Sequence, residues 1–288
     1  MKTRDTILNG EMFHIREWGD ATNPTLLMLH GFPEFGGAWG DLAERLKGDY
    51  FCVAPDQRGY GGSYAPAEVA AYRVSQMLGD IVALIEQLGG PVVVIGHDWG
   101  SAVAYGLAMA RPDLVEKLVV LNGVHPGPFQ KALAAGGAQT AASQYMSYLQ
   151  REGSEALLAA NGYEKLLSLF AENMDMSWMT PERREVYINE WSKPGRLRGM
   201  VNWYRATPLI IPKPGQTADV EMPDPAKLRI SMPHLLIWGM GDTALLAEAT
   251  EGLETYCDAL TRMEVAEADH WIVHQCPDRL AEILRDWL

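Results

Sequence analysis

The sequence predicts an α/β fold: a mostly parallel sheet flanked by helices, with a helical segment inserted between two strands. Short apolar runs alternate with longer amphipathic ones, which is the pattern of a parallel sheet covered on both faces. This alternation stops after Leu121 and resumes at His234. The 288 residues leave room for one large domain with an insertion or for two small domains, and 48% hydrophobic residues suffice for a substantial core.

The predicted strands are brief, rich in β-branched or large aliphatic residues, and end at Gly, Pro, Asn or His-Gly breaks. They are Thr25–Leu29, Tyr50–Ala54, Pro91–Ile95, Leu118–Leu121 and His234–Trp238. An antiparallel hairpin is expected before them, with its turn near Asn9-Gly10. Apolar residues at helical spacing predict one helix that stops at Gly89 and another that starts near Pro277: Ile81, Leu84, Ile85 and Leu88, then Leu280, Ile283, Leu284 and Leu288.

Residues 126–225 contain no clear strand-like run and are rich in Met, Trp and Tyr. Helical stretches there are punctuated by Gly and Pro, and a Pro-rich run from Pro208 to Pro225 leads back to the next strand. Because the flanking strands complete one sheet, a helical cap inserted into a single α/β domain is the simplest account. We therefore expect residues 1–125 and 226–288 to form the core and residues 126–225 to form the cap.

Composition disfavours several classes of function. The formal charge of −13 argues against nucleic acid and anionic membranes as partners, because both need basic surfaces. No apolar run approaches the length that spans a bilayer, and charged residues follow Met1 where a signal peptide needs its apolar region. The three cysteines form no CxxC pair and suggest neither disulfides nor zinc. We expect a cytoplasmic protein without a metal site.

The strand-like run Val92–Ile95 leads directly into Gly96-His97-Asp98-Trp99-Gly100, and small residues follow. A strand, a sharp turn with a glycine on each side and a helix make the nucleophile elbow of the α/β-hydrolase fold, here with Asp98 at its centre. The elbow exposes its central side chain at the carboxyl edge of the sheet, where α/β folds place their ligands. The alternative is an ordinary turn in which Asp98 is a helix N-cap, a place that Asp favours.

An Asp in place of the usual Ser changes the reaction that the elbow can perform. A carboxylate is ionised at neutral pH and needs no base to become a nucleophile. It attacks an sp³ carbon by displacement and yields an alkyl-enzyme ester. A base is needed only afterwards, to activate the water that hydrolyses this ester. Peptidase and ordinary esterase functions are therefore not expected.

Candidate partners of Asp98 follow later strands of the sheet. His270 comes after the strand-like run from Met263 to Ala266 and is predicted to be the base. Asp242 comes after the last long apolar strand and is predicted to orient His270 and stabilise its imidazolium. Two alternatives stay open at this point: Asp242 as a helix N-cap, and Asp269 as the acid.

The remaining positions are assigned by their place relative to these strands. The amides of Phe32 and Trp99 are predicted to form an oxyanion hole, because they follow the first parallel strand and the nucleophile. An acid could also follow Leu121, but that position holds Asn122 and no carboxylate. Three other histidines are weaker candidates for the base, since they lie in an early strand, in the elbow and near the last helix: His14, His97 and His274.

Together these motifs resemble the epoxide hydrolase and haloalkane dehalogenase branch of the α/β-hydrolases, from His30 to the C-terminus. The matching segments are HGFPE at 30–34, DQRGYGGS at 56–63, GHDWG at 96–100, Asp242 and His270-Trp271. The first two resemble epoxide hydrolases, whereas dehalogenases typically show Asn in the first loop. The resemblance implies hydrolysis of an epoxide to a vicinal diol without a cofactor. A haloalkane dehalogenase is the nearest alternative, and a small-ligand receptor that has lost turnover is a more distant one.

The resemblance also implies two tyrosines in the cap that bind and protonate the epoxide oxygen. Tyr204 matches one of the two segments, and Tyr145 matches the other better than Tyr148 does. A phenol can donate a proton to a developing alkoxide, whereas a halide needs none; the alternative is that both tyrosines only pack in the cap. We expect a small apolar epoxide as substrate of a monomer or homodimer, in a pocket lined by Phe32, Pro33, Trp99, Met146, Tyr148, Trp203 and Trp271.

Overall fold

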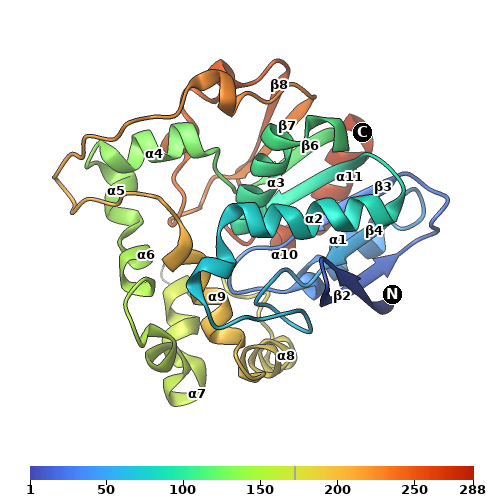
Figure 1. The fold of residues 1–288 in the computed structure, drawn as a ribbon, viewed down its shortest axis with the longest axis horizontal. Helices are drawn as coiled ribbons and strands as arrows, with labels where there is room; N and C mark the ends of the chain where they lie inside the picture. The colour runs from blue at the N-terminus through green and yellow to red at the C-terminus, as the bar shows by residue number, and fades with distance from the viewer. Residues whose placement is uncertain (172) are drawn as a thin grey trace.

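A computed structural model describes residues 1–171 and 173–288. At its centre is one eight-stranded sheet in the order β1-β2-β4-β3-β5-β6-β7-β8 (Figure 1). β1 pairs antiparallel with β2, β2 pairs antiparallel with β4, and the other pairs are parallel, which confirms the predicted sheet. The strands are β1 (Lys2–Leu8), β2 (Glu11–Trp18), β3 (Thr25–Leu29), β4 (Phe51–Pro55), β5 (Val92–His97), β6 (Val115–Leu121), β7 (His234–Gly239) and β8 (Leu260–Val265).

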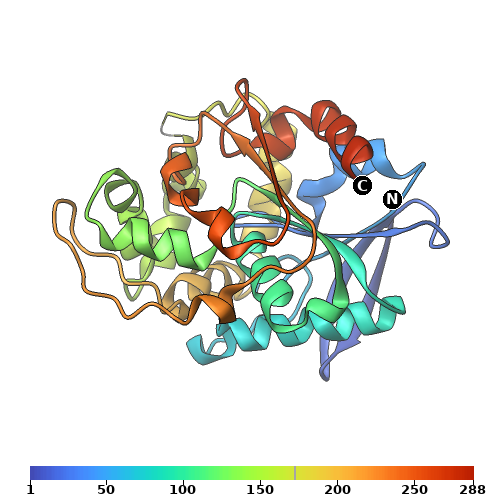
Figure 2. The same cartoon turned by 90° about the horizontal axis from the view of Figure 1, so that it is seen from above.

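Helices cover both faces of this sheet, as its continuous apolar strands require. Alternate residues of β5 serve the two sides: Val92 and Val94 belong to the core with α2 and α3, whereas Val93 and Ile95 pack with α1 and α11. Figure 2 shows α2 and α11 on opposite sides of the sheet. These helices are α1 (Gly40–Leu46), α2 (Val74–Leu88), α3 (Trp99–Ala110), α10 (Ile272–Gln275) and α11 (Pro277–Trp287). Short 3₁₀ turns lie in the segments between strands and helices: η1 (Gly36–Trp39), η2 (Val69–Tyr72), η3 (Pro112–Leu114), η4 (Pro225–Leu228), η5 (Ala247–Thr250) and η6 (Leu253–Tyr256).

The chain between β6 and β7 is helical, and its described residues contain no strand, as predicted. The helices are α4 (Pro126–Ala134), α5 (Ala138–Ala142), α6 (Gln144–Leu149), α7 (Ser154–Ala171), α8 (Pro181–Ser192) and α9 (Arg196–Ala206). Non-helical backbone from Ala160 to Tyr163 divides α7. Figure 1 shows α5 to α9 gathered on one side of the molecule, away from both termini. The domain boundaries at 126 and 225 stay a prediction.

Local signals mark most of the element boundaries correctly. The turn between β1 and β2 falls at Asn9 and Gly10, with φ of 52° and 87°, and Gly89 ends α2 with φ of 94°. β6 begins at Val115, earlier than the predicted Leu118. Glu116 and Lys117 interrupt the apolar pattern in the sequence but belong to the strand. In the described part of the chain, no helix is long and apolar enough to cross a bilayer.

Candidate active site

Asp98 lies at a sharp turn between β5 and α3, with φ of 49° and ψ of −122°. Close packing explains the glycines on both sides of it. A Cβ at Gly96 would lie 2.7 Å from Cα of Ser101, and a Cβ at Gly100 would lie 1.9 Å from the carbonyl oxygen of Leu29. The Asp98 side chain makes no capping hydrogen bond to α3, so its interpretation as an ordinary N-cap is wrong. The strained turn instead presents a carboxylate at the carboxyl edge of the sheet.

The two oxygens of the Asp98 carboxylate have different neighbours. Oδ1 accepts a hydrogen bond from the backbone amide of Phe32 at 2.7 Å. Oδ2 lies 3.8 Å from Nε2 of His270. Burial raises the pKa of Asp98, and the nearby histidines and backbone amides offset only part of this effect. The structure thus places the Phe32 amide within hydrogen-bond distance of the elbow carboxylate, and the role of the Phe32 and Trp99 amides as an oxyanion hole stays a prediction.

His270 follows β8 and Asp242 follows β7, so both lie at the same edge of the sheet as Asp98. Nδ1 of His270 lies 2.8 Å from Oδ2 of Asp242, and both side chains are buried. Burial lowers the pKa of His270, but Asp242, Asp98 and Glu34 outweigh it and raise this pKa to about 9. The imidazole therefore bridges two carboxylates, with one nitrogen toward each.

Asn122 holds Asp242 in place. From the sequence we noted only that this position, which could have held the acid, has no carboxylate. Its Nδ2 donates to Oδ2 of Asp242 at 2.9 Å and to the carbonyl of Gly239 at 3.1 Å. Its Oδ1 accepts the Gly239 amide at 2.7 Å. One buried amide thus joins the ends of β6 and β7 and orients the acid. The only signal of this role in the sequence is that an Asn directly follows a central apolar strand.

Hydrogen bonds also decide between the alternatives for the acid. Oδ1 of Asp242 accepts two backbone amides of the following turn, each at 2.9 Å, while Oδ2 faces His270; the residue therefore stabilises a turn and contacts the imidazole. Asp269 instead directs Oδ2 to the backbone amide of Asp175 at 2.7 Å and Oδ1 to the amide of the next residue but one. Its carboxylate ties the loop after β8 to the helical segment, and Asp242 is the carboxylate that faces Nδ1.

A buried polar cluster that the sequence did not predict lies behind His270. Glu34 contacts His97 Nδ1 at 3.2 Å, His274 Nε2 at 2.6 Å and the hydroxyl of Tyr187 at 3.0 Å. Nε2 of His97 lies 2.8 Å from the carbonyl oxygen of His270. Burial opposes ionisation of Glu34, but His274 and His97 outweigh it and hold the pKa of this carboxyl well below its usual range. The cluster fixes the backbone that carries His270.

Tyr145 on α6 and Tyr204 on α9 are brought together near Asp98. Their ring centres are 6.1 Å apart, and the ring of Tyr204 stands perpendicular to that of Trp99 at 5.1 Å. Burial raises the pKa of both phenols, and the nearby charge of Asp98 raises it further. Two helices that are distant in sequence therefore place two protonated phenols beside the elbow.

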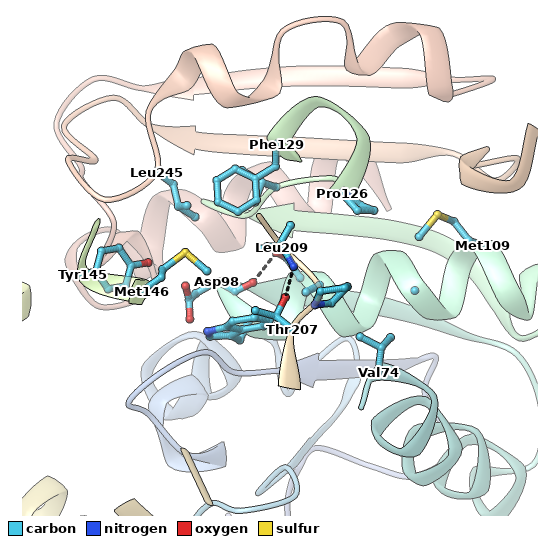
Figure 3. A pocket seen from close by; sticks show the side chains of 16 residues that line it. Val74, Asp98, Met109, Pro126, Phe129, Tyr145, Met146, Thr207, Leu209 and Leu245 are labelled. Carbon is cyan, nitrogen blue, oxygen red and sulfur yellow. Dashed lines mark hydrogen bonds between the residues drawn. The ribbon is translucent and has the colours of Figure 1, made fainter. Parts of the chain in front are cut away.

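A cavity of about 210 Å³ lies in front of Asp98, with Tyr145 at the same end (Figure 3). Of the residues predicted to line the pocket, Trp99 and Met146 do so. The other lining residues are largely apolar and come from α2, α3, the loop after β6, α4, the segment after α9 and the loop after β7: Val74, Ser101, Ala102, Gly106, Met109, Val124, Pro126, Phe129, Thr207, Pro208, Leu209 and Leu245.

The lining differs from the prediction at five positions: Phe32, Pro33, Tyr148, Trp203 and Trp271. Pro33 and Trp271 line a separate small space. Trp203 is buried and donates its indole N–H to the carbonyl of Arg58 at 2.9 Å. Tyr148 packs against a neighbouring guanidinium group 5.7 Å from its ring centre, so Tyr145 is the tyrosine of this pair that reaches the cavity. These side chains lie outside the cavity lining, a distinction that residue type alone does not make.

Comparison with known proteins identifies the family. A family model with the description "Alpha/beta hydrolase family" matches residues 26–283 of this chain. This chain belongs to that family. The AB hydrolase superfamily protein YfhM of Bacillus subtilis is 34% identical over 283 residues, 97% of this chain and 95% of that protein. Epoxide hydrolase 4 of Mus musculus is 31% identical over 278 residues, 94% of this chain and 74% of that protein. A solved structure of novel epoxide hydrolases from hot-environment metagenomes has a TM-score of 0.90 and 34% identity, covering 99% of this chain and 97% of that one.

In this α/β-hydrolase the segment from Asp56 to Ser63 has a structural role. Asp56 accepts backbone amides at 2.8 Å and 2.7 Å from two neighbouring loops, and Gln57 donates to the carbonyl of His30 at 2.5 Å. Arg58 forms two hydrogen bonds of 2.7 Å with the buried carboxylate of Asp80. The segment therefore fixes the loop whose amide donates to Asp98.

In the described part of the chain, no group of His, Cys, Asp and Glu side chains could hold a metal ion.

Proposed function

We propose that this α/β-hydrolase converts a small apolar epoxide and water into a vicinal diol through an alkyl ester on Asp98. One observation carries the proposal: the carboxylate has a backbone amide at one oxygen, the His270–Asp242 pair at the other, and two phenols nearby. The names of the relatives and of the similar solved structures support the same reaction. Asp98, the substrate and water supply every bond that the reaction makes or breaks.

In the first step Oδ2 of Asp98 attacks a ring carbon, and the bond between that carbon and the epoxide oxygen breaks. The oxygen takes a proton from Tyr145 or Tyr204 and becomes a hydroxyl. Oδ1, which already accepts the Phe32 amide, becomes the carbonyl oxygen of the ester. The proton donor matters because an alkoxide is a poor leaving group in water. Burial keeps both phenols protonated at neutral pH.

In the second step water attacks the carbonyl carbon of the ester while Nε2 of His270 takes its proton. Negative charge develops on Oδ1, where the amides of Phe32 and Trp99 donate. Asp242 stabilises the imidazolium. The bond between the acyl carbon and Oδ2 then breaks, and Oδ2 leaves as the second diol oxygen with the proton from His270. The water oxygen takes its place in the carboxyl group of Asp98. The carboxyl proton left on Asp98 returns to the tyrosinate, which balances the cycle.

The orientation of Trp99 favours an epoxide over a haloalkane. A dehalogenase on this elbow needs the indole N–H of Trp99 as a donor to halide. In this chain the indole of Trp99 stands perpendicular to the ring of Tyr204, with the ring centres 5.1 Å apart. The indole therefore faces a phenol, which is the kind of proton donor that an epoxide needs and a halide does not.

Turnover of a panel of epoxides and haloalkanes by the purified protein tests the proposal. We expect diol from styrene oxide, no bromide from 1-bromobutane, and loss of diol formation in Asp98→Asn. Bromide release without turnover of styrene oxide would favour the dehalogenase. If wild-type protein turned over neither class while Asp98→Ala bound a small ligand tightly, the chain would instead be a receptor.

A further inference from the structure

The described lining of the active-site cavity extends to one side of Asp98. Asp98 and Tyr145 lie at one end, and Val74 and Met109 lie at the other (Figure 3). On the far side of Asp98, His270 is only 3% exposed and lines no part of this cavity. An epoxide held at Asp98 therefore has room for a long substituent on one ring carbon and little room for one on the other.

Helix α3 forms a straight wall of this cavity. Its lining residues Trp99, Ala102, Gly106 and Met109 recur every three or four positions, which places them on one helical face. With a rise of about 1.5 Å per residue, this face runs about 15 Å from Trp99 to Met109. Ala102 and Gly106 in its middle carry almost no side chain. The wall therefore leaves space for an extended chain along the helix.

The cavity has no cationic side chain that could pair with an anionic group on the substituent. Among its described lining residues Asp98 alone is charged, and none is Lys, Arg or His. The hydroxyl of Ser101 already donates to the backbone carbonyl of Asp98, and Oγ1 of Thr207 accepts the amide of Leu209 at 3.4 Å. An ionised group on the substituent would lose its hydration here without gaining a partner. The lining therefore selects a substituent that is both apolar and uncharged.

We propose that the preferred substrate is a terminal epoxide with one long, uncharged apolar substituent that lies along α3. The ring sits between Asp98 and Tyr145, and the chain passes Ala102 and Gly106 toward Val74, which is 37% exposed and marks the end nearest solvent. The inference rests on the proposed function and adds the class of epoxide. Each methylene group buried along this wall strengthens binding by removing apolar surface from water.

A matched series of 1,2-epoxybutane, 1,2-epoxyhexane and 1,2-epoxyoctane tests the length of the site. We expect kcat/KM to rise about two- to fourfold for each added methylene, since burial of one CH₂ is worth up to about a fourfold change. Turnover of all three at equal kcat/KM would overturn this inference and leave the proposed function intact. Turnover of none would overturn both.

A second pair tests the charge of the site. 7,8-Epoxyoctanoate has the same chain as 1,2-epoxyoctane but ends in a carboxylate, which would be placed among apolar side chains without a cation. We expect its kcat/KM to be at least tenfold lower. Equal values for the two compounds would refute selection of an uncharged substituent.

Variants on the walls test the position of the chain. Ala102 lines the cavity in the middle of α3 and is half-buried, so Ala102→Leu narrows the path proposed for the substituent. We expect the ratio of kcat/KM for 1,2-epoxyoctane to that for 1,2-epoxybutane to fall at least tenfold. The matched control is Ala110→Leu at the exposed end of α3, which should leave this ratio unchanged. If Ala102→Leu does not fold, Val74→Trp narrows the same cavity from an exposed position. An unchanged ratio in the folded variant would overturn the proposal.

Discussion

Replacing Asp242 by Asn keeps the size of the side chain and removes the charge that faces His270. Oδ2 of Asp242 lies 2.8 Å from Nδ1 of the imidazole, in a buried place. An amide there offers either an uncharged acceptor or an NH₂ group that favours the wrong tautomer of His270. Both outcomes weaken the base that activates water. Attack of Asp98 on the epoxide does not use this base, so we expect only the second step to slow strongly.

The size of the effect follows from the pKa of His270. Burial lowers this pKa, but the surrounding carboxylates raise it from 6.5 to about 9, and Asp242 contributes most to the rise. Once Asp98 is esterified its charge is gone, and Asp242 is the carboxylate in contact with the imidazole. A loss of about 2 pKa units is worth about 3 kcal/mol of imidazolium stabilisation. Ester hydrolysis in Asp242→Asn should therefore be slower by a factor on the order of 100.

Rapid quenching followed by intact-mass measurement separates the two steps. We expect Asp242→Asn to be alkylated at nearly the wild-type rate and to accumulate much more ester than the wild type does. Asp269→Asn is the matched control, because that carboxylate lies one residue from His270 but bonds to backbone amides; its ester hydrolysis should change by only a few fold. Hydrolysis at the wild-type rate, or equal slowing of both steps, would refute the role assigned to Asp242.

Three further predictions concern ring opening and stability. Changing Tyr145 and Tyr204 together to Phe should slow single-turnover alkylation by about 10²–10⁴-fold, the range of general acid catalysis; undiminished alkylation would exclude both as proton donors. Asp80→Asn breaks a buried ion pair and should cost about 3–5 kcal/mol of unfolding free energy, whereas Asp113→Asn at an exposed pair should change the unfolding free energy far less; equal costs in urea unfolding would contradict this. Burial lowers the pKa of His125 to about 4, below the 6.5 of an exposed histidine. As the pH falls, His125 is therefore protonated in the unfolded chain before it is protonated in the folded chain. Stability should drop from about pH 6.5 to pH 4, and His125→Gln should reduce the slope by about 1 kcal/mol per pH unit; an unchanged slope would argue against it.

The fold and the elbow could be predicted because their signals are local. Strands such as Thr25–Leu29 are short apolar runs with clear stops, and the spacing of Gly96, Asp98 and Gly100 reflects steric limits within one turn. His270 and Asp242 could be nominated because parallel strands end at one edge of the sheet, so a residue just after a strand is placed in space by that strand.

The rest depends on contacts between distant segments, which local patterns do not record. Glu34 meets His274 across 240 positions of the chain, and Asn122 reaches Asp242 only because β6 and β7 are neighbours in the sheet. The prediction of the pocket lining was wrong at several positions for a related reason. Trp203 has the residue type of a pocket wall, but its indole N–H is used in the core, whereas the small residues along α3 that do line the cavity carry no such signal.

The central claim is that Asp98 forms an ester with the substrate and that His270 is needed to hydrolyse it. His270→Ala incubated with styrene oxide and analysed by intact mass tests this claim directly. We predict a mass increase of one substrate, located by fragmentation on the peptide that contains Asp98, and no diol beyond a single turnover. His14→Ala, which changes a histidine on β2 instead, should accumulate no more adduct than the wild type does. Absence of any adduct on His270→Ala, or an adduct at a residue other than Asp98, would contradict the account.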